Sequence, residues 1–171
     1  MGAKHKLTRI LNPAPVHAEL GAPMLRCADI ITPNETEFSL LLERFANTDV
    51  DPATLAQRDD ADLHALARKL GVATVVVTLG SKGCFVSHGE QRRGDAAACY
   101  RLPPEKVKAI DTTGAGDAFS GNLAAALLLF HDAPFARAVT HANRAAAMST
   151  ETVGTAPAMP RFEDVRKRFG D

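Results

Sequence analysis

The residues best suited to chemistry lie in one short segment, residues 111–119, with the sequence DTTGAGDAF. The segment joins a predicted strand to a long apolar helix, so its two glycines stand where the helix begins. Glycines at such a place let several amide hydrogens point to one spot, and the helix dipole adds attraction for an anion. Fixed donors of this kind suit a phosphoryl group in transfer, and Asp117 could accept the proton of an attacking hydroxyl. The alternative is a tight turn in which Asp117 only stabilises the helix.

The elements that must position this segment alternate along the chain. Strands are predicted near residues 7–11, 29–31, 72–79 and 84–88, with short extended pieces near 99–102 and 107–110. Helices are predicted over residues 16–26, 34–45, 52–70, 114–130, 134–150 and 162–169. The run 72–79 is β-branched and nearly all apolar, which is typical of a parallel strand buried on both faces. This alternation predicts an α/β fold with helices packed on a sheet.

Composition narrows the class of protein. The 171 residues include 20 basic and 20 acidic side chains, so no net charge attracts a phosphate backbone or an anionic membrane. The longest apolar run, residues 123–130, is far shorter than the ~20 residues that span a bilayer. Cys27, Cys84 and Cys99 lack the spacing of a zinc site and are expected to be free thiols. We therefore expect a soluble cytoplasmic protein without nucleic-acid or membrane partners.

Five segments together resemble one family. Residues 111–121, DTTGAGDAFSG, are similar to the C-terminal signature of the ribokinase family of carbohydrate kinases. The other four agree with that family in order and spacing: NPAP at 12–15, NETE at 34–37, TLGSKG at 78–83 and ANRAAA at 142–147. The resemblance implies a ribokinase-like α/β fold of three layers, helix, sheet and helix. It also implies ATP and Mg²⁺ as cofactors and a small sugar as substrate.

The resemblance assigns the catalytic step to residues 114–117. Asp117 would be the base that deprotonates the primary hydroxyl of the sugar. Gly114, Ala115 and Gly116 would form, with Asp117, the anion hole for the γ-phosphate.

The resemblance also places six residues at the nucleotide. They are Asn34 and Glu37, which would order Mg²⁺ and its waters, Thr78, Gly80 and Gly83 at the phosphates or ribose, and Asn143 beside the adenine. Carboxylate and amide oxygens suit magnesium, which commonly keeps several waters. The residues alone allow plainer alternatives: a helix cap with a solvated acid for Asn34 and Glu37, an ordinary hairpin turn after Thr78, and an exposed polar residue for Asn143.

Family members often bind potassium beside the anion hole. Asp111 and the carbonyl of Thr113 match part of that site, and the loop at Gly154 would add carbonyl oxygens. Ala158 departs from the serine that ribokinases commonly carry. The histidines His17, His64, His88, His131 and His141 show no metal-ligand spacing with one another and are expected to be surface or hydrogen-bonded residues.

Members of the family are about twice as long, and the match here begins midway along them. No glycine-rich sugar-binding motif or lid occurs in these residues, so residues 1–171 are expected to be the C-terminal nucleotide-binding and catalytic portion of one domain. Three functions follow. The first is a ribokinase that converts D-ribose to ribose 5-phosphate, with little or no activity expected of the isolated chain. The others are another sugar or nucleoside kinase and a non-catalytic nucleotide-binding fragment. Homodimers are common among ribokinases, and an incomplete sheet invites self-association.

Overall fold

The computed structural model describes residues 7–170, which form two compact units. The sheet unit contains the described residues up to Arg92 together with Ala97–Arg101. The helical unit contains Arg93–Ala96 and the described residues from Leu102 onward. The single domain expected over residues 1–171 stays a prediction, and its residues 1–6 and 171 lie outside the described part.

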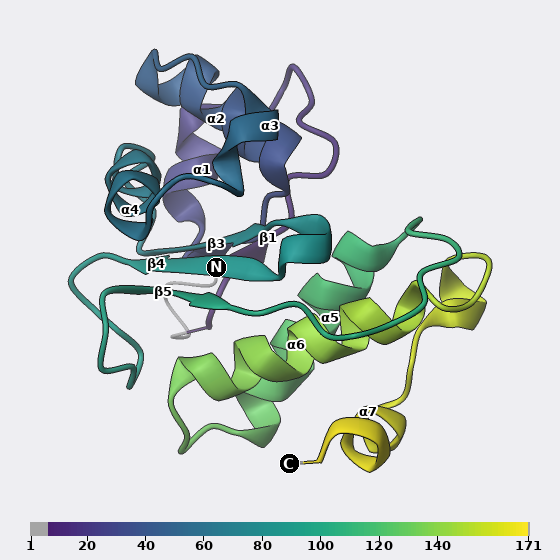
Figure 1. Cartoon of the computed structure of the whole chain (residues 1–171). Coiled ribbons are helices and arrows are strands. Elements are labelled where there is room, and N and C mark those ends of the chain that lie inside the picture. The colour runs from purple at the N-terminus through teal and green to yellow at the C-terminus, as the bar shows by residue number, and fades with distance from the viewer. Residues whose placement is uncertain (1–6, 171) are drawn as a thin grey trace. The chain divides into compact units, whose positions relative to one another are not determined.

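The sheet has five strands in the order β1-β2-β3-β4-β5 (Figure 1). Their bounds are β1 Ile10–Leu11, β2 Ile30–Ile31, β3 Thr74–Thr78, β4 Cys84–His88 and β5 Cys99–Leu102. The first three strands are parallel, whereas β3 and β4 form an antiparallel hairpin in which Val76 faces Val86. The first four residues of β3 are buried, as its apolar run predicts. The sheet is mixed rather than purely parallel because the turn after β3 is too short for a crossover connection.

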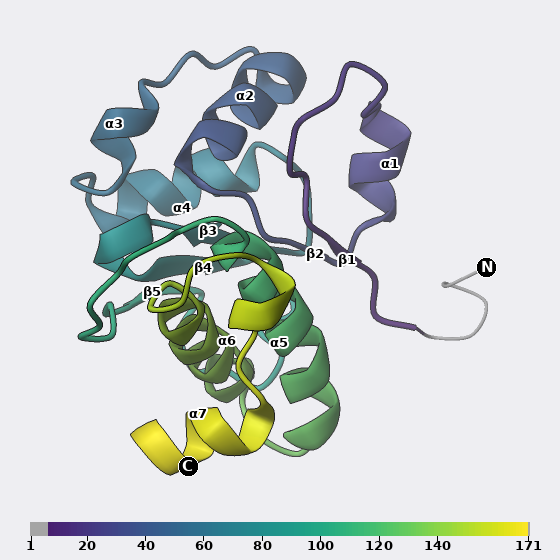
Figure 2. The same cartoon turned by 90° about the vertical axis from the view of Figure 1, so that its right-hand side faces the viewer.

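Four helices lie on one side of this sheet (Figures 1 and 2). They are α1 Ala22–Cys27, α2 Glu35–Ala46, α3 Pro52–Leu55 and α4 Asp60–Arg68. Helix α2 buries Phe38, Leu41 and Leu42, three and four residues apart, so one stripe of the helix faces the core. Val75 and Val77 of β3 belong to the same apolar cluster. Burial of this stripe packs α2 against the sheet.

Three expected elements differ in the structure. The helix predicted over residues 52–70 is two helices, because Asp51 caps α3 and Asp59 caps α4 as a second start. Of the helix predicted over 16–26, only the last part is helical, in α1, which ends one residue later at Cys27. Residues 107–110 form no strand; instead the amides of Ile110 and Asp111 donate to the Thr150 carbonyl at 2.7 and 3.0 Å.

The helical unit consists of α5 Ala115–Leu129, α6 Phe135–Ser149, a 3₁₀ turn at Ala156–Ala158 and α7 Phe162–Phe169. Helices α5 and α6 lie side by side, and α7 packs on α6 (Figures 1 and 2). Buried alanines, including Ala126 of α5 and Ala142 of α6, suit a close approach of the two helices. Large apolar side chains remain exposed at Leu128 and Leu129 near the end of α5. No helix within residues 7–170 is long and apolar enough to cross a membrane.

Candidate active site

The predicted residues of the sheet unit meet where β2 ends and α2 begins. Asn34 caps α2: its side-chain oxygen accepts the amide of Glu37 at 2.9 Å. In return, Oε2 of Glu37 accepts the amide of Asn34, also at 2.9 Å, which completes a capping box. The expected helix cap is therefore present. Oε1 of Glu37 accepts no hydrogen bond from the described residues, so the half-buried carboxylate has one oxygen without a protein partner.

The carboxyl end of β3 lies beside this cap. The Thr78 amide donates to the Pro33 carbonyl at 2.9 Å, and Asn34 and Thr78 form an isolated parallel bridge. The turn after β3 places Gly80 and Gly83 at φ values of +49° and +86°, a region that favours glycine. In open α/β sheets, ligands bind outside the carboxyl ends of the strands. The sheet unit thus brings Asn34, Glu37, Thr78 and the two turn glycines to the edge where a ligand is expected.

Glu35 lies beside the turn after β3, and the sequence analysis did not single it out. Its Oε1 lies 3.9 Å from the position that a Cβ would take on Gly80. Burial raises the pKa of the Glu35 carboxyl, and a backbone hydrogen bond partly offsets that rise. The sequence signal that could have found Glu35 is its position directly after the Asn34 helix cap. A carboxyl group of raised pKa at a strand-end cluster is a common mark of a functional site.

The helical unit builds the second group around the start of α5. Gly114 caps the helix at φ +78°, and a Cβ there would lie 3.1 Å from Cγ2 of Thr155. A side chain at this position is thus both strained and crowded. Gly116 has no such constraint, since a Cβ there would meet nothing within 4 Å. The segment therefore opens onto free space at Gly116, beside the exposed carboxylate of Asp117.

The amides of this first turn lie at the positive end of the helix dipole. The Ala115 amide donates to the Thr112 carbonyl at 3.2 Å, whereas the Gly116 amide has no intrahelical acceptor one turn earlier. Asp117 occupies the first turn as an acidic residue, a position that the helix dipole favours. The arrangement can hold an anion at the backbone with a carboxylate next to it.

Asp111 ties the loop before α5 to the loop after α6. Its Oδ1 accepts the Thr113 amide and its Oδ2 the Gly154 amide, both at 2.9 Å. The Thr113 side chain, the Gly154 amide and the Thr113 amide together lower the pKa of Asp111 to about 2. The structure thus brings together the three residues expected at the potassium site. Both carboxylate oxygens already accept amides, so Asp111 organises the loops whose carbonyls would face a cation.

Asn143, the residue expected beside the adenine, lies on α6. Its Nδ2 donates to the Pro103 carbonyl at 3.0 Å, so the side chain anchors the segment that follows β5. Its expected place beside adenine stays a prediction. Among the described residues, no group of three or more histidine, cysteine, aspartate or glutamate side chains is placed to bind a metal directly. A magnesium ion held through waters and phosphates needs no such group.

Known proteins are similar in sequence to this chain along most of its length. The profile of the pfkB family carbohydrate kinases matches residues 2–161. The chain belongs to this family. A ribokinase of Haemophilus influenzae is 36% identical over 161 residues, which are 94% of this chain and 47% of that pfkB relative. The chain spans about half the length of the curated relatives it matches.

Two solved ribokinase structures have the same fold. The Thermotoga maritima ribokinase superposes with a TM-score of 0.80 at 29% identity, covering 99% of this chain and 52% of that one. The Arabidopsis thaliana ribokinase, complexed with ribose and ATP, has a TM-score of 0.75 at 27% identity over 96% of this chain and 48% of that one. The α/β, ribokinase-like and partial fold expected from the sequence is confirmed.

Proposed function

We propose that this chain carries the nucleotide-binding and phosphoryl-transfer portion of an ATP-dependent ribokinase. The reaction would move the γ-phosphoryl group of ATP to the primary hydroxyl of D-ribose, giving ADP and ribose 5-phosphate. The observation that carries the proposal is the first turn of α5. There Gly116, on which a Cβ would meet nothing within 4 Å, and the exposed carboxylate of Asp117 share the positive end of one helix.

Each residue of that turn has a distinct task in the proposed step. Asp117 accepts the hydroxyl proton as the sugar oxygen bonds to the γ-phosphorus, and the bond from phosphorus to the bridging oxygen breaks to release ADP. The amides of residues 114–117 hold the transferring phosphoryl oxygens, whose charge is stabilised by fixed donors without reorganisation. Gly114 sets the angle of the turn, because its positive φ beside Thr155 excludes a side chain.

The sheet unit would hold the rest of the nucleotide. Thr78, Gly80 and Gly83 end and turn the β3 hairpin and would lie at the phosphates or ribose, with Gly80 exposed and Gly83 buried in the turn. The free oxygen of Glu37 would take a water of the magnesium shell, with Asn34 holding Glu37 in place through the capping box. Magnesium supplies charge neutralisation on the phosphates when bound. Asn143 would lie beside adenine.

A potassium ion is proposed beside the anion hole. The carbonyls of Thr113 and of the Gly154 loop would face it, and Asp111 would supply the negative charge that holds both loops. Ala158 is buried and lacks the hydroxyl that ribokinases commonly carry at this position. Potassium is therefore expected to raise activity through the geometry of residues 111–116 and not through direct contact with the sugar.

The second candidate function is a nucleotide-binding fragment without sugar kinase activity. The half-length match to the relatives favours it, since positioning a hydroxyl and excluding water contribute about 7–11 kcal/mol to such a transfer. The NPAP segment at residues 12–15 favours ribose over other sugars and nucleosides. For the purified 171-residue chain we expect binding of Mg·ATP with little or no ribose-dependent release of ADP.

Two measurements test the proposal. Calorimetric titration with ATP, with and without Mg²⁺, measures the nucleotide site of the chain itself. A fusion that adds the N-terminal portion of the Haemophilus ribokinase then provides turnover. In that fusion Asp117→Asn should lower kcat about 10²–10⁴-fold and leave the Kd for ATP nearly unchanged, because the base acts on the hydroxyl. Unchanged turnover would refute the assignment of Asp117, and the absence of any ATP binding would refute the nucleotide site.

A further inference from the structure

The segment between β5 and α5 leads directly into the first turn of α5, yet residues 103–111 form neither helix nor strand. Hydrogen bonds to the rest of the helical unit must therefore set its direction. At its end, the amides of Ile110 and Asp111 both donate to the Thr150 carbonyl, before Asp111 binds the two loop amides described above. Whatever holds the chain after α6 in place thus also determines where α5 begins.

Glu151, the residue after Thr150, is the point at which this segment meets the last helix. Its Oε1 accepts the Lys108 amide at 3.1 Å. The same Oε1 accepts Nη2 of Arg168 at 3.2 Å, and Oε2 accepts Nη1 of that guanidinium. The carboxylate thus joins a backbone amide three residues before Asp111 to a side chain in the last turn of α7.

The pair of Glu151 and Arg168 has the geometry of a strong contact. Two hydrogen bonds from one guanidinium to one carboxylate fix the orientation of both groups, which a single contact between two mobile side chains does not. The Arg168 side chain is 37% exposed and the Glu151 side chain 26%, so water screens the pair only in part. Both oxygens of Glu151 are therefore held in the position that meets the Lys108 amide.

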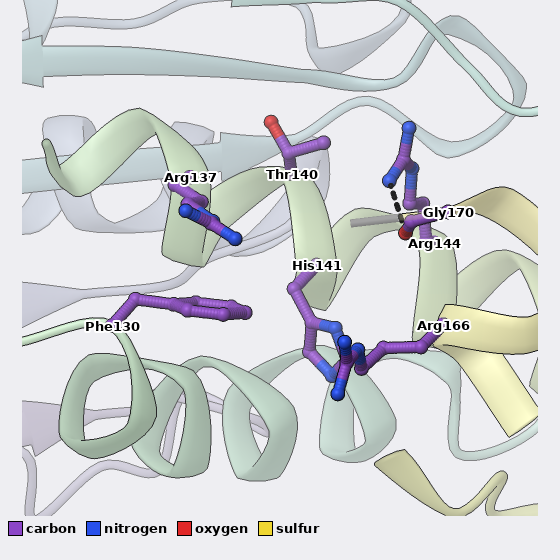
Figure 3. Close-up of a pocket in the computed structure, with 7 residues that line it drawn as sticks. All are labelled: Phe130, Arg137, Thr140, His141, Arg144, Arg166 and Gly170. Carbon is purple, nitrogen blue, oxygen red and sulfur yellow. Dashed lines mark hydrogen bonds between the residues drawn. The ribbon is translucent and has the colours of Figure 1, made fainter. Parts of the chain in front are cut away.

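Helix α7 is itself fixed at the end that carries Arg168. Nη1 of Arg144, on α6, donates to the carbonyl of Gly170, the residue that caps α7, at 3.3 Å (Figure 3). Nε of Arg144 donates to Glu105 at 3.2 Å, so the same side chain also contacts the segment before α5. Cζ of Arg144 and Cζ of Arg168 lie 5.5 and 5.2 Å from the centroid of the Phe169 ring. Arg168 thus extends from a helix end that is already held in place.

We propose that Glu151 and Arg168 are positioning residues for the first turn of α5. Through the Lys108 amide they hold residues 108–111 beside the chain that follows α6, and so fix the direction in which the amides of residues 114–117 point. The inference rests on the proposed function for the role of that turn. Neither side chain needs to contact the nucleotide. If the ion pair is broken, the Lys108 amide loses a fixed acceptor, and the turn is free to leave the orientation that suits a phosphate.

Calorimetric titration of the 171-residue chain with Mg·ATP tests the effect on binding. Arg168→Gln and Glu151→Ala should each weaken binding about three- to tenfold, the range that corresponds to the net worth of one hydrogen bond. Glu151→Gln keeps a carbonyl oxygen for the Lys108 amide and should lie between Glu151→Ala and wild type. Arg9→Gln is the matched control and should bind as wild type does. The pair of Arg9 and Asp29 is also bidentate, has the same exposed fractions of 37% and 26%, and lies at the amino ends of β1 and β2.

NMR without any ligand measures the effect on the loop itself. The amide protons of Thr113 and Gly154, whose acceptor is Asp111, should change chemical shift in Arg168→Gln and keep their wild-type shifts in Arg9→Gln. Urea unfolding of both variants gives the stability that each ion pair contributes. Because the two pairs are alike in geometry and exposure, a shift confined to Arg168→Gln cannot come from lost stability alone.

Three results would count against the inference, and they can be told apart. If Arg168→Gln leaves the Thr113 and Gly154 amides at their wild-type shifts, α7 does not position the loop. If these amides shift but Mg·ATP binds as tightly as to wild type, the loop moves without any effect on the phosphate site. In both cases the proposed function stands, since the wild-type chain binds Mg·ATP. If the wild-type chain binds no Mg·ATP, the proposed function fails and this inference fails with it.

Discussion

Replacing the glycines of α5 one at a time by alanine separates backbone constraint from ligand contact. Gly114, Gly116 and Gly121 lie close together at and after one helix start, yet their surroundings differ. Gly114 has φ +78° with Thr155 next to it, whereas Gly116 and Gly121 are helical, and a Cβ on either would meet nothing within 4 Å. The same change at three sites should therefore have three different effects.

The expected magnitudes follow from these surroundings. At Gly114 an alanine must adopt a left-handed conformation, which costs about 1–2 kcal/mol, and its methyl would also press on Cγ2 of Thr155 at 3.1 Å. At Gly116 and Gly121 an alanine restricts the unfolded chain and favours the helix, a gain of up to about 1 kcal/mol. Stability should then rank Gly116→Ala and Gly121→Ala above wild type, and Gly114→Ala below it.

Ligand binding should follow a different order. The methyl of Gly116→Ala would stand in the open space where the phosphate oxygens are proposed to approach, so binding of Mg·ATP should weaken strongly. Gly121→Ala, more than one turn further along α5, is the matched control and should bind as wild type does. Urea unfolding followed by circular dichroism measures the stability, and calorimetric titration with Mg·ATP measures the affinity.

Two outcomes would contradict this reasoning. If Gly116→Ala binds Mg·ATP as tightly as Gly121→Ala, the first turn of α5 is not the phosphate site. If Gly114→Ala is as stable as wild type, the left-handed cap does not constrain the turn. The first result concerns function and the second concerns only the fold, so each can be wrong without the other.

Three further predictions concern titratable groups. The carboxyl of Asp111 has a pKa of about 2 in the folded chain, below its usual value. Its ionised form therefore stabilises the fold above about pH 4, and this stabilisation is lost as the pH falls toward 2. Asp111→Asn should lower the free energy of unfolding, measured with urea, at pH 7 but much less near pH 2. The carboxyl of Glu35 has a raised pKa in the folded chain, so its ionised form opposes folding once the pH exceeds the pKa that this carboxyl has in the unfolded chain. Glu35→Gln should therefore be at least as stable as wild type at pH 7 in urea unfolding. A marked loss of stability in this variant would contradict the prediction. Burial raises the pKa of the Cys84 thiol to about 12; iodoacetamide should therefore label exposed Cys27 first and reach Cys84 only on unfolding, as peptide mass analysis would show.

Several elements were predictable from local signals in the sequence. The Asn34 cap is followed three residues later by an acid, and the structure has that capping box and a helix ending within one residue of the expected end. The apolar run before the Gly80 turn likewise predicts the β3–β4 hairpin. In both places the signal and the structure depend on neighbours in the chain, so no knowledge of distant contacts was required.

Other features depended on contacts that periodicity does not report. Leu55 and Leu63 are both buried in one core, so their spacing is compatible with a continuous helix although Asp59 starts a new one. The extended piece at 107–110 has the composition of a strand, yet the amide of Ile110 pairs with the loop at Thr150. Expecting His141 to be a surface or hydrogen-bonded residue was wrong, because no sequence pattern reveals an unmet buried nitrogen.

The two edge strands of the sheet affect how copies of this chain would associate. Within residues 7–170, β1 closes one side with only two residues, and β5 closes the other with four half-buried ones. Short edge strands pair poorly with the strands of another copy, and the charged side chain of Arg101 on β5 disfavours such pairing further. Clustering of copies at high concentration should therefore proceed through apolar helix surfaces such as Leu128, and a mild detergent that covers such surfaces should reverse it.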